Sequence, residues 1–348
     1  MAGGNGFHRD DGTGMATRAA WLHYAAGLTQ AEVAKRLGLT SLKAHRLIMK
    51  ANHDGLVKVY IDGEVSECVK LEQDLHSRYG LDYCQVVPDF DPDELPLKAL
   101  GIGGAQFLKR EIERGDEMLI GVGHGRTLAA CVEYLPRTTT SGVRFVSLLG
   151  GLTRKFSANP HDVIHRLAER TGAEAYFMPV PFFANSVEDR NILFSQRGVR
   201  DVFDLAAGAD LLIVGIGTAQ MEASLVATGM IERSEIEEAR RAGAVGEVLG
   251  HFFDKAGRPV DTPMSDRTFT LGREQLAGRR IVAVAGGRVK LDAMRAVLAS
   301  GLLNGLITDE RTALALSAGE GDGDPVGAGR VRARSNGRDA GSGSRHRD

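Results

Sequence analysis

Four glycine-rich turns follow short apolar runs in this sequence, and turns of this kind can bind an anion. Glycine allows backbone N–H groups to turn toward a ligand, and a helix that begins after the turn adds partial positive charge. One such turn carries little weight, because a tight strand–helix turn needs glycine in any case. The turns span residues 121–127, 150–153, 215–218 and 285–290, and the donor side chains that accompany them are Arg126, Thr127, Thr153 and Lys290. Together they predict a ligand that carries a phosphate group.

The same turns lack the signature of a nucleotide cofactor. Residues 121–125 read GxGxG rather than GxGxxG, and Gln220 stands where the turn at 215–217 would need its third glycine. The GxxxxGK[ST] loop of nucleoside triphosphatases does not occur in the sequence. We therefore expect neither an NAD site nor an ATP site, and no cofactor.

Cysteine usage and hydropathy indicate a cytoplasmic protein. Cys68, Cys84 and Cys131 are far apart and form no CxxC pair, so neither a disulfide framework nor a zinc site is expected. Apolar runs stay far below the length of a membrane helix, and the first ten residues carry no signal-type apolar stretch. We expect no metal and no contact with a membrane.

A second kind of chemistry is suggested by the basic N-terminal region. Residues 1–60 hold eight Lys or Arg against four Asp or Glu, whereas the whole chain of 348 residues has a formal net charge of −2. This imbalance is typical of a module that contacts nucleic acid, although a small helical cap with solvated basic residues would look the same. The candidate DNA-contacting residues are Thr29, Gln30, Ser41, Lys43, His45, Arg46 and Lys50.

Short helices must position these residues. Trp21, Leu22, Tyr24 and Ala25 predict the apolar face of a first helix. Thr29 and Glu32 form a T-x-x-E capping box for a second helix that ends at Gly38. A third helix over 41–50 follows after a three-residue turn, which gives a helix-turn-helix arrangement. In that arrangement the later helix enters the major groove, and its first turns meet the base edges.

From residue 81 onward short apolar runs alternate with amphipathic segments, which predicts an α/β fold with a mostly parallel sheet. The apolar runs are 83–87, 118–122, 143–148, 173–178, 210–215, 244–253, 280–285 and 305–308; the helical segments are 97–114, 126–135, 158–171 and 289–300. Ligands of such sheets bind beyond the carboxyl ends of the strands, which is where the glycine turns fall.

Composition divides the chain into five parts. The predicted parts are a disordered N-terminus (1–15), a helix-turn-helix DNA-binding domain (16–62), a connecting helix (63–80), an effector-binding domain (81–317) and a disordered tail (318–348). Residues 56–61 alternate and predict a small wing strand. The connecting helix could self-associate through Cys68, Leu71 and Leu75, or it could dock on its own domain. Both alternatives stay open.

In this order the motifs resemble the SorC family of bacterial sugar-responsive transcriptional regulators over about residues 16–317. The motifs that carry the resemblance are 28–37 with 41–50, GVGHGRTL at 121, GGLT at 150, PVPFFA at 179, GIGT at 215, FDKAGR at 253, AGGRVK at 285 and LITDE at 306. The resemblance implies an N-terminal DNA-binding domain and a Rossmann-like effector domain similar to sugar-phosphate isomerases and deaminases. It also implies a phosphorylated sugar or polyol as effector and a dimer or tetramer as assembly.

Carried onto this sequence, the resemblance implies effector contacts from Gly123, His124, Gly125, Arg126, Thr127, Gly150, Gly151, Thr153, Asp254 and Lys290. Two positions depart from the family pattern. His124 stands where many members have Trp, and Leu149 stands where some have a lysine, so imine capture of an aldehyde is not expected. The segment 19–24 and His124 are also similar to the erythritol-operon regulators within the family.

The sequence therefore favours a cytoplasmic, non-enzymatic regulator of a carbohydrate or polyol operon, whose partners are operator DNA, a phosphorylated effector and further copies of itself. The alternative from another class is a sugar-phosphate isomerase or deaminase, because the effector fold is shared. That chemistry needs a carboxylate base, for which Asp254, Asp309 and Glu310 are the candidates. Asp309 and Glu310 also fit as the cap of a following helix.

Overall fold

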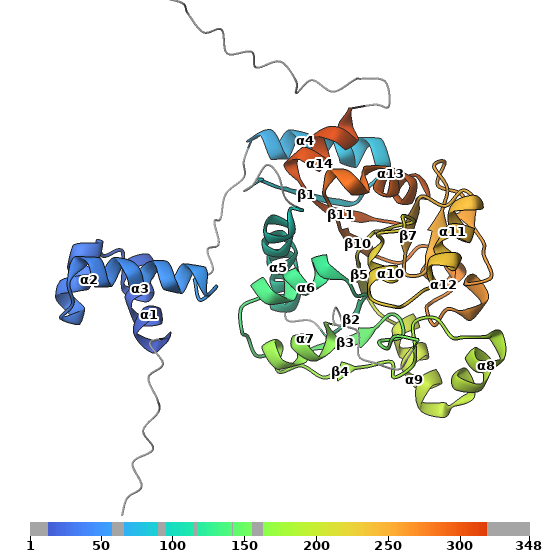
Figure 1. Cartoon of the computed structure of the whole chain (residues 1–348), viewed down its shortest axis with the longest axis horizontal. Helices are drawn as coiled ribbons and strands as arrows, with labels where there is room; N and C mark the ends of the chain where they lie inside the picture. Colours follow the sequence, from blue (N-terminus) through green and yellow to red (C-terminus); the bar gives the residue numbers. More distant parts are fainter. Residues whose placement is uncertain are drawn as a thin grey trace, which may run out of the picture.

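The structure is a computed structural model that describes residues 13–57, 66–89, 95–114, 117–140, 142–154 and 163–318. Four helical segments make up the N-terminal part, and the residues from 66 onward form an α/β body (Figure 1). The N-terminal segments are α1 (Thr13–Ala20), the π-helical η1 (Trp21–Ala25), α2 (Gln30–Leu37) and α3 (Ser41–His53).

The core of the N-terminal part is built from small and branched side chains. Ala19, Leu22, Val33, Ala44 and Ile48 are buried together. The predicted apolar face of the first helix was correct only for Leu22, since 62% of Trp21 and 47% of Tyr24 is exposed and Ala25 is exposed as well. Alanines of α1 take the inward positions instead, because they allow α1 to pack closely on α3.

The junction between α2 and α3 follows the predicted helix-turn-helix pattern. The Thr29 hydroxyl accepts from the Glu32 N–H at 3.4 Å, and Glu32 Oε2 accepts from the Thr29 N–H at 2.8 Å, which completes the capping box. Gly38 ends α2 in the left-handed conformation with φ 66°, which a residue with a side chain rarely adopts. Thr40 then caps α3 by accepting from the Lys43 N–H.

Several predicted boundaries differ from the structure or fall outside it. Helix α1 begins at Thr13, so residues 13–15 are helical rather than disordered as predicted. Residues 56–57 form no strand, and residues 58–61 of the predicted wing lie outside the described residues, as do 1–12 and 319–348 of the two predicted disordered ends.

The body contains a seven-stranded sheet in which every paired neighbour is parallel, in the order β1-β11-β10-β5-β2-β3-β4. The strands are β1 (Tyr83–Val87), β2 (Met118–Val122), β3 (Val143–Ser147), β4 (Ala175–Tyr176), β5 (Leu211–Val214), β10 (Ile281–Val284) and β11 (Gly305–Asp309). All seven lie within or nearly within predicted apolar runs. Such runs are expected for strands that are covered on both faces.

Helices cover both faces of this sheet. One buried cluster joins the sheet to α5 (Leu97–Glu113), α6 (Arg126–Tyr134) and α7 (Ile164–Thr171). The other joins it to α4 (Ser66–Tyr79), α9 (Arg197–Ala207), α13 (Leu291–Ala299) and α14 (Glu310–Ser317). Alternate residues of one strand serve the two faces: Ile281 and Ala283 point to the second cluster, Val282 and Val284 to the first.

Helix α4 belongs to the body and is not a free connector. Figure 1 shows it beside α14, and its Cys68 and Leu75 are 3% and 0% exposed. Arg78 Nη1 donates to the Ser317 carbonyl at 2.7 Å, and Glu72 Oε1 accepts from the Val86 N–H at 2.7 Å. Of the two alternatives for this helix, the structure therefore supports docking on its own domain, and its apolar stripe is used there.

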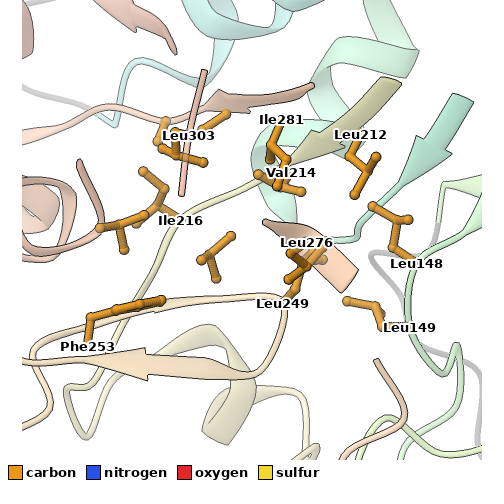
Figure 2. Packing of buried hydrophobic residues seen from close by; sticks show 14 of the residues in the cluster. Leu148, Leu149, Leu212, Val214, Ile216, Leu249, Phe253, Leu276, Ile281 and Leu303 are labelled. Carbon is orange, nitrogen blue, oxygen red and sulfur yellow. The ribbon is translucent and has the colours of Figure 1, made fainter. Parts of the chain in front are cut away.

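The run 244–253 does not extend the parallel sheet as predicted. It forms the hairpin of β7 (Gly246–Val248) and β8 (His251–Phe253) within an antiparallel sheet, β6-β7-β8-β9, completed by β6 (Gly217–Thr218) and β9 (Pro259–Val260). Leu249, with φ 52°, and Gly250, with φ 80°, make its tight turn. In Figure 2, Leu249 and Phe253 of this sheet lie across from Leu212, Val214 and Ile281 of the parallel sheet.

Short helical segments complete the body. They are α8 (Val187–Ser195), α10 (Ser224–Ala227), α11 (Arg233–Arg241), η2 (Ser265–Arg267), α12 (Arg273–Leu276) and η3 (Arg288–Lys290). The sequence analysis assigned no helix to residues 179–243, so α8, α9, α10 and α11 were missed.

Candidate functional site

A cavity of about 380 Å³ opens over the carboxyl ends of three neighbouring strands, β10, β5 and β2. Its walls come from the turn after β2, the turn after β5, helix α10, strand β7 and η3. This is the edge at which parallel α/β sheets bind ligands. The cavity brings together six of the ten predicted effector contacts: Gly123, His124, Gly125, Arg126, Thr127 and Lys290.

The amino end of α6 forms one wall. Gly125 precedes the helix with φ 125°, a conformation that favours glycine, and among the described residues no side chain caps the helix. The first backbone N–H groups of α6 thus lie at the cavity with the partial positive charge of the helix end behind them. Arg126 and Thr127 add a cation and a hydroxyl. This wall suits a phosphate group.

Lys290 lies on the opposite side of the cavity, at the end of η3. Its Nζ donates to the carbonyl of Ile216 at 2.8 Å, which fixes the ammonium over the turn that follows β5. Burial and, to a smaller extent, the nearby Arg126 lower the pKa of Lys290 to about 8, against the raising influence of Glu247. An anion between Arg126 and Lys290 would relieve the repulsion between these two cations.

Glu247 is a cavity residue that the sequence analysis missed. It projects from β7, is 7% exposed, and accepts from the Gly250 N–H at 2.5 Å. Burial raises its pKa to about 7, against the lowering influence of the Gly250 N–H and of Lys290. A single acid within the otherwise apolar run 244–253 was the available signal, because a buried carboxylate needs partners.

Further polar residues reach the cavity from the segment around α10. They are Gln220, Glu222, Ser224 and Thr228. From the sequence, Gln220 was noted only as a break in a glycine motif, and the other three were not predicted. With Glu247 they supply carboxylate, amide and hydroxyl groups to the cavity lining. Such groups are the usual partners of the hydroxyls of a polyhydroxylated ligand.

The glycine pair in the turn after β3 does not reach this cavity. Gly150 donates its N–H to the Phe269 carbonyl at 3.1 Å, and Gly151 donates to the Met178 carbonyl at 3.2 Å. A Cβ on Gly150 would lie 2.3 Å from the carbonyl oxygen of Pro181. Gly150 and Gly151 therefore serve backbone packing, and Thr153, 5% exposed, follows them outside the cavity lining. Leu149 from the same turn does line the cavity.

Asp254 also lies outside the cavity lining. Its carboxylate accepts from the N–H groups of Ala256 and Arg258, both at 2.9 Å, and from Arg258 Nε at 2.8 Å. These hydrogen bonds organise the turn between β8 and β9, and they lower the pKa of Asp254. The structure thus gives Asp254 a local structural role.

The turn after β10 contributes Lys290 and its neighbour Val289 but no free glycine cradle. The Gly287 N–H is donated to Asp309 Oδ2 at 3.2 Å and to Thr312 Oγ1 at 2.8 Å. Asp309 also accepts from the Thr312 N–H at 2.9 Å and thereby caps α14, as the sequence suggested. Neither Asp309 nor Glu310 lines the cavity.

The candidate DNA-contacting residues are exposed on the N-terminal part. Ser41, Lys43, His45 and Arg46 stand on the first turns of α3, whose opposite face is buried through Ala44, Ile48 and Ala51. Lys50 pairs with Asp54, and the Thr29 hydroxyl is used in the capping box. Gln30 is exposed at the start of α2. The first turns of α3 thus present exposed hydrogen-bond donors of the kind that a groove-reading helix uses.

Neither a membrane-spanning helix nor a metal-type cluster occurs among the residues that the structure describes. The helices described here are all too short or too polar to cross a bilayer. In the same part of the chain, no group of three or more His, Cys, Asp or Glu side chains lies close enough to hold a metal ion.

Comparison with known proteins gives consistent results. The family described as "Putative sugar-binding domain" matches residues 63–317. The chain is 60% identical over 302 residues to the erythritol catabolism regulatory protein EryD of Brucella abortus, covering 87% of this chain and 96% of that protein. It is 36% identical over 309 residues to the transcriptional regulator LsrR of an Enterobacter species, covering 87% and 93%.

Solved structures agree with these relatives. The full-length sorbitol operon regulator SorC of Klebsiella pneumoniae superposes with a TM-score of 0.64 at 26% identity, covering 89% of this chain and all of that one. A domain of a possible sugar-binding transcriptional regulator of Arthrobacter aurescens gives 0.65 at 26% identity, covering 72% and 97%.

Proposed function

The chain belongs to the SorC family of sugar-binding transcriptional regulators, and we propose that a phosphorylated sugar or polyol switches its binding to operator DNA. The observation that carries the proposal is the cavity over β10, β5 and β2, where the open end of α6 faces Lys290. Cationic side chains and helix N–H groups on two sides suit a dianionic phosphate.

The phosphate is assigned to the wall formed by Arg126, Thr127 and the amino end of α6, with Lys290 completing its contacts. Hydrogen bonds to charged groups contribute about 1.5–3 kcal/mol each, so these contacts favour a phosphorylated ligand over its parent alcohol. The hydroxyl groups of the ligand are assigned to Glu247 and to the polar residues around α10. Because the relative named for erythritol catabolism shares 60% of its residues, erythritol phosphate is the first effector to test.

Operator binding is assigned to the N-terminal part, with α3 in the major groove and Lys43 and Arg46 among its contacts. We infer a homo-oligomer, because two copies of one short recognition helix read a palindromic site more specifically than one. We place the regulator in the cytoplasm, because its operator DNA is there. Effector and operator would be linked by a coupling free energy, typically 1–3 kcal/mol.

We further propose that the chain does not turn over its effector. Two of the three predicted base candidates are hydrogen-bonded to local backbone, Asp254 in a turn and Asp309 at a helix cap, and none lines the cavity. One observation favours an isomerase or deaminase: Glu247 is a buried carboxylate at the ligand site. Incubation of the purified chain with erythritol phosphate and with sugar phosphates, followed by product analysis, separates the two functions.

The proposal is tested by titration calorimetry of the full chain with erythritol phosphate, erythritol and inorganic phosphate. We expect the phosphorylated polyol to bind at least tenfold more tightly than erythritol, and inorganic phosphate to bind more weakly than the whole ligand. Equal affinities for erythritol and its phosphate would remove phosphate recognition from the proposal.

A further inference from the structure

Helix α3 carries two exposed apolar side chains on the face that points away from its own core. At 100° per residue, Leu42 lies 160° around the helix axis from the buried Ala44, and Met49 lies 140° from it on the same outward side. Leu42 is 61% exposed and Met49 is 52% exposed. Arg46, four residues after Leu42, is also on the outward face and lies between them along the helix axis. Along the outward face of α3, from its amino end, an apolar, a cationic and an apolar side chain thus follow one another.

This arrangement does not serve the fold of the N-terminal part. The buried cluster of this part takes Ala44 and Ile48 from α3 and does not include Leu42 or Met49. An exposed leucine in the first turn of a helix adds no cap, since Thr40 supplies it. The side chain stands instead between Ser41 and Lys43, two residues suited to contacts with bases and phosphates.

We propose that Leu42 is a base-reading residue that contacts the C5-methyl group of a thymine in the major groove of the operator. The inference rests on the proposed insertion of α3 into that groove. Thymine is the one base of DNA that presents a methyl group there, and apolar side chains at the start of a recognition helix are its natural partners. Contact with it would bury the exposed surface of Leu42, while Arg46 reaches a guanine or a phosphate one helical turn away.

The position of Leu42 favours it over Met49. Recognition helices meet the base edges with their amino-terminal residues, whereas later turns leave the groove floor. Leu42 is the second residue of α3 and Met49 the ninth. Met49 therefore provides a matched control: it has similar exposure, lies on the same outward face, and stands two turns further from the helix start.

The experiment begins with selection of duplexes from a randomised DNA library by the full-length chain, which yields the probe. Each thymine of the selected duplex is then replaced in turn by deoxyuridine, which removes only the methyl group. Affinities are measured by fluorescence anisotropy for the wild type, Leu42→Ala and Met49→Ala. For the wild type we expect one thymine in each half-site at which the replacement weakens binding about fourfold, the value of about one buried methyl group.

Leu42→Ala is expected to lose this thymine preference at the same position, whereas Met49→Ala retains it. Both variants should keep the wild-type circular dichroism spectrum, because neither side chain is in the core. Insensitivity of the wild type to every deoxyuridine, or an unchanged preference in Leu42→Ala, overturns the proposal. Failure to select any sequence, or selected duplexes whose affinity is unaffected by Arg46→Ala, would instead contradict the proposed placement of α3.

Discussion

Two glycine turns of this protein look alike in the sequence and do different work in the structure. The turn after β2, at 121–127, opens into the cavity and leaves the amino end of α6 exposed to a ligand. The turn after β3, at 150–153, donates its N–H groups to the carbonyls of Phe269 and Met178 and fits against Pro181 without room for a Cβ. A glycine pair therefore signals a close approach, but the partner can be a ligand or the backbone.

The largest expected effect is a difference in stability between glycine variants of the two turns. In Gly150→Ala, the new Cβ would lie within 2.6 Å of backbone atoms of both Pro181 and Val180, so we expect a loss of about 3 kcal/mol or more in the free energy of unfolding. In Gly123→Ala, the nearest atoms lie at 3.5 Å, so a change within about 1 kcal/mol is expected. Urea unfolding of the two variants measures the difference, and equal stabilities would contradict it.

The next effect concerns the ligand side of the comparison. Lys290→Ala should weaken binding of erythritol phosphate by about 1.5–3 kcal/mol, roughly 10- to 150-fold, because a charge-assisted contact is lost. Operator binding without effector should persist, since Lys290 lies in the body. The exposed Lys255, in the turn between β8 and β9, gives a control with the same change of charge. If calorimetry showed equal losses of affinity in both variants, Lys290 would act through general electrostatic attraction and not through a direct contact with the phosphate.

The affinity for a phosphorylated effector should also depend on pH. In the free protein the pKa of Lys290 is about 8, and a bound phosphate raises it, so binding takes up a proton above pH 8. The Lys290 contribution is therefore complete below about pH 8 and is lost as the pH rises through the pKa of the complex. Titrations at pH 7 and pH 9 should show a loss of up to tenfold, which is absent in Lys290→Ala. A pH-independent wild type would contradict a buried, titrating Lys290.

The smallest effect tests Asp254, which was predicted as an effector contact and lies outside the cavity lining. Asp254→Ala removes the acceptor for the Ala256 and Arg258 N–H groups, so we expect a small loss of stability, seen as a slightly lower melting temperature. The affinity for erythritol phosphate should stay within twofold of the wild type. Thermal-shift measurements check the stability, and calorimetry checks the affinity. A tenfold loss of affinity with unchanged stability would show that Asp254 contacts the effector after all.

Local patterns in the sequence determined most of the elements. The capping box at Thr29 and Glu32 and the stop at Gly38 each act within one helical turn, so the helix-turn-helix pattern was legible from neighbouring residues. The apolar runs that became the strands of the parallel sheet were equally legible, because a strand covered on both faces is apolar along its whole length. By contrast, the apolar run 244–253 gave no sign that it belongs to a second, antiparallel sheet, since a hairpin and a single buried strand share this composition.

The content of the site was decided by tertiary structure. Strand order places β10, β5 and β2 side by side, so that Lys290, the turn at 215–217 and Arg126 meet although long stretches of chain separate them. Glu247 joins them because the small sheet folds over the same edge. The sequence supplied residue types and glycine turns, but hydrophobic periodicity carries no information about which strands become neighbours. Whether these residues come together depends on how the whole core packs. The same packing decides which glycine turn faces a ligand and which faces backbone.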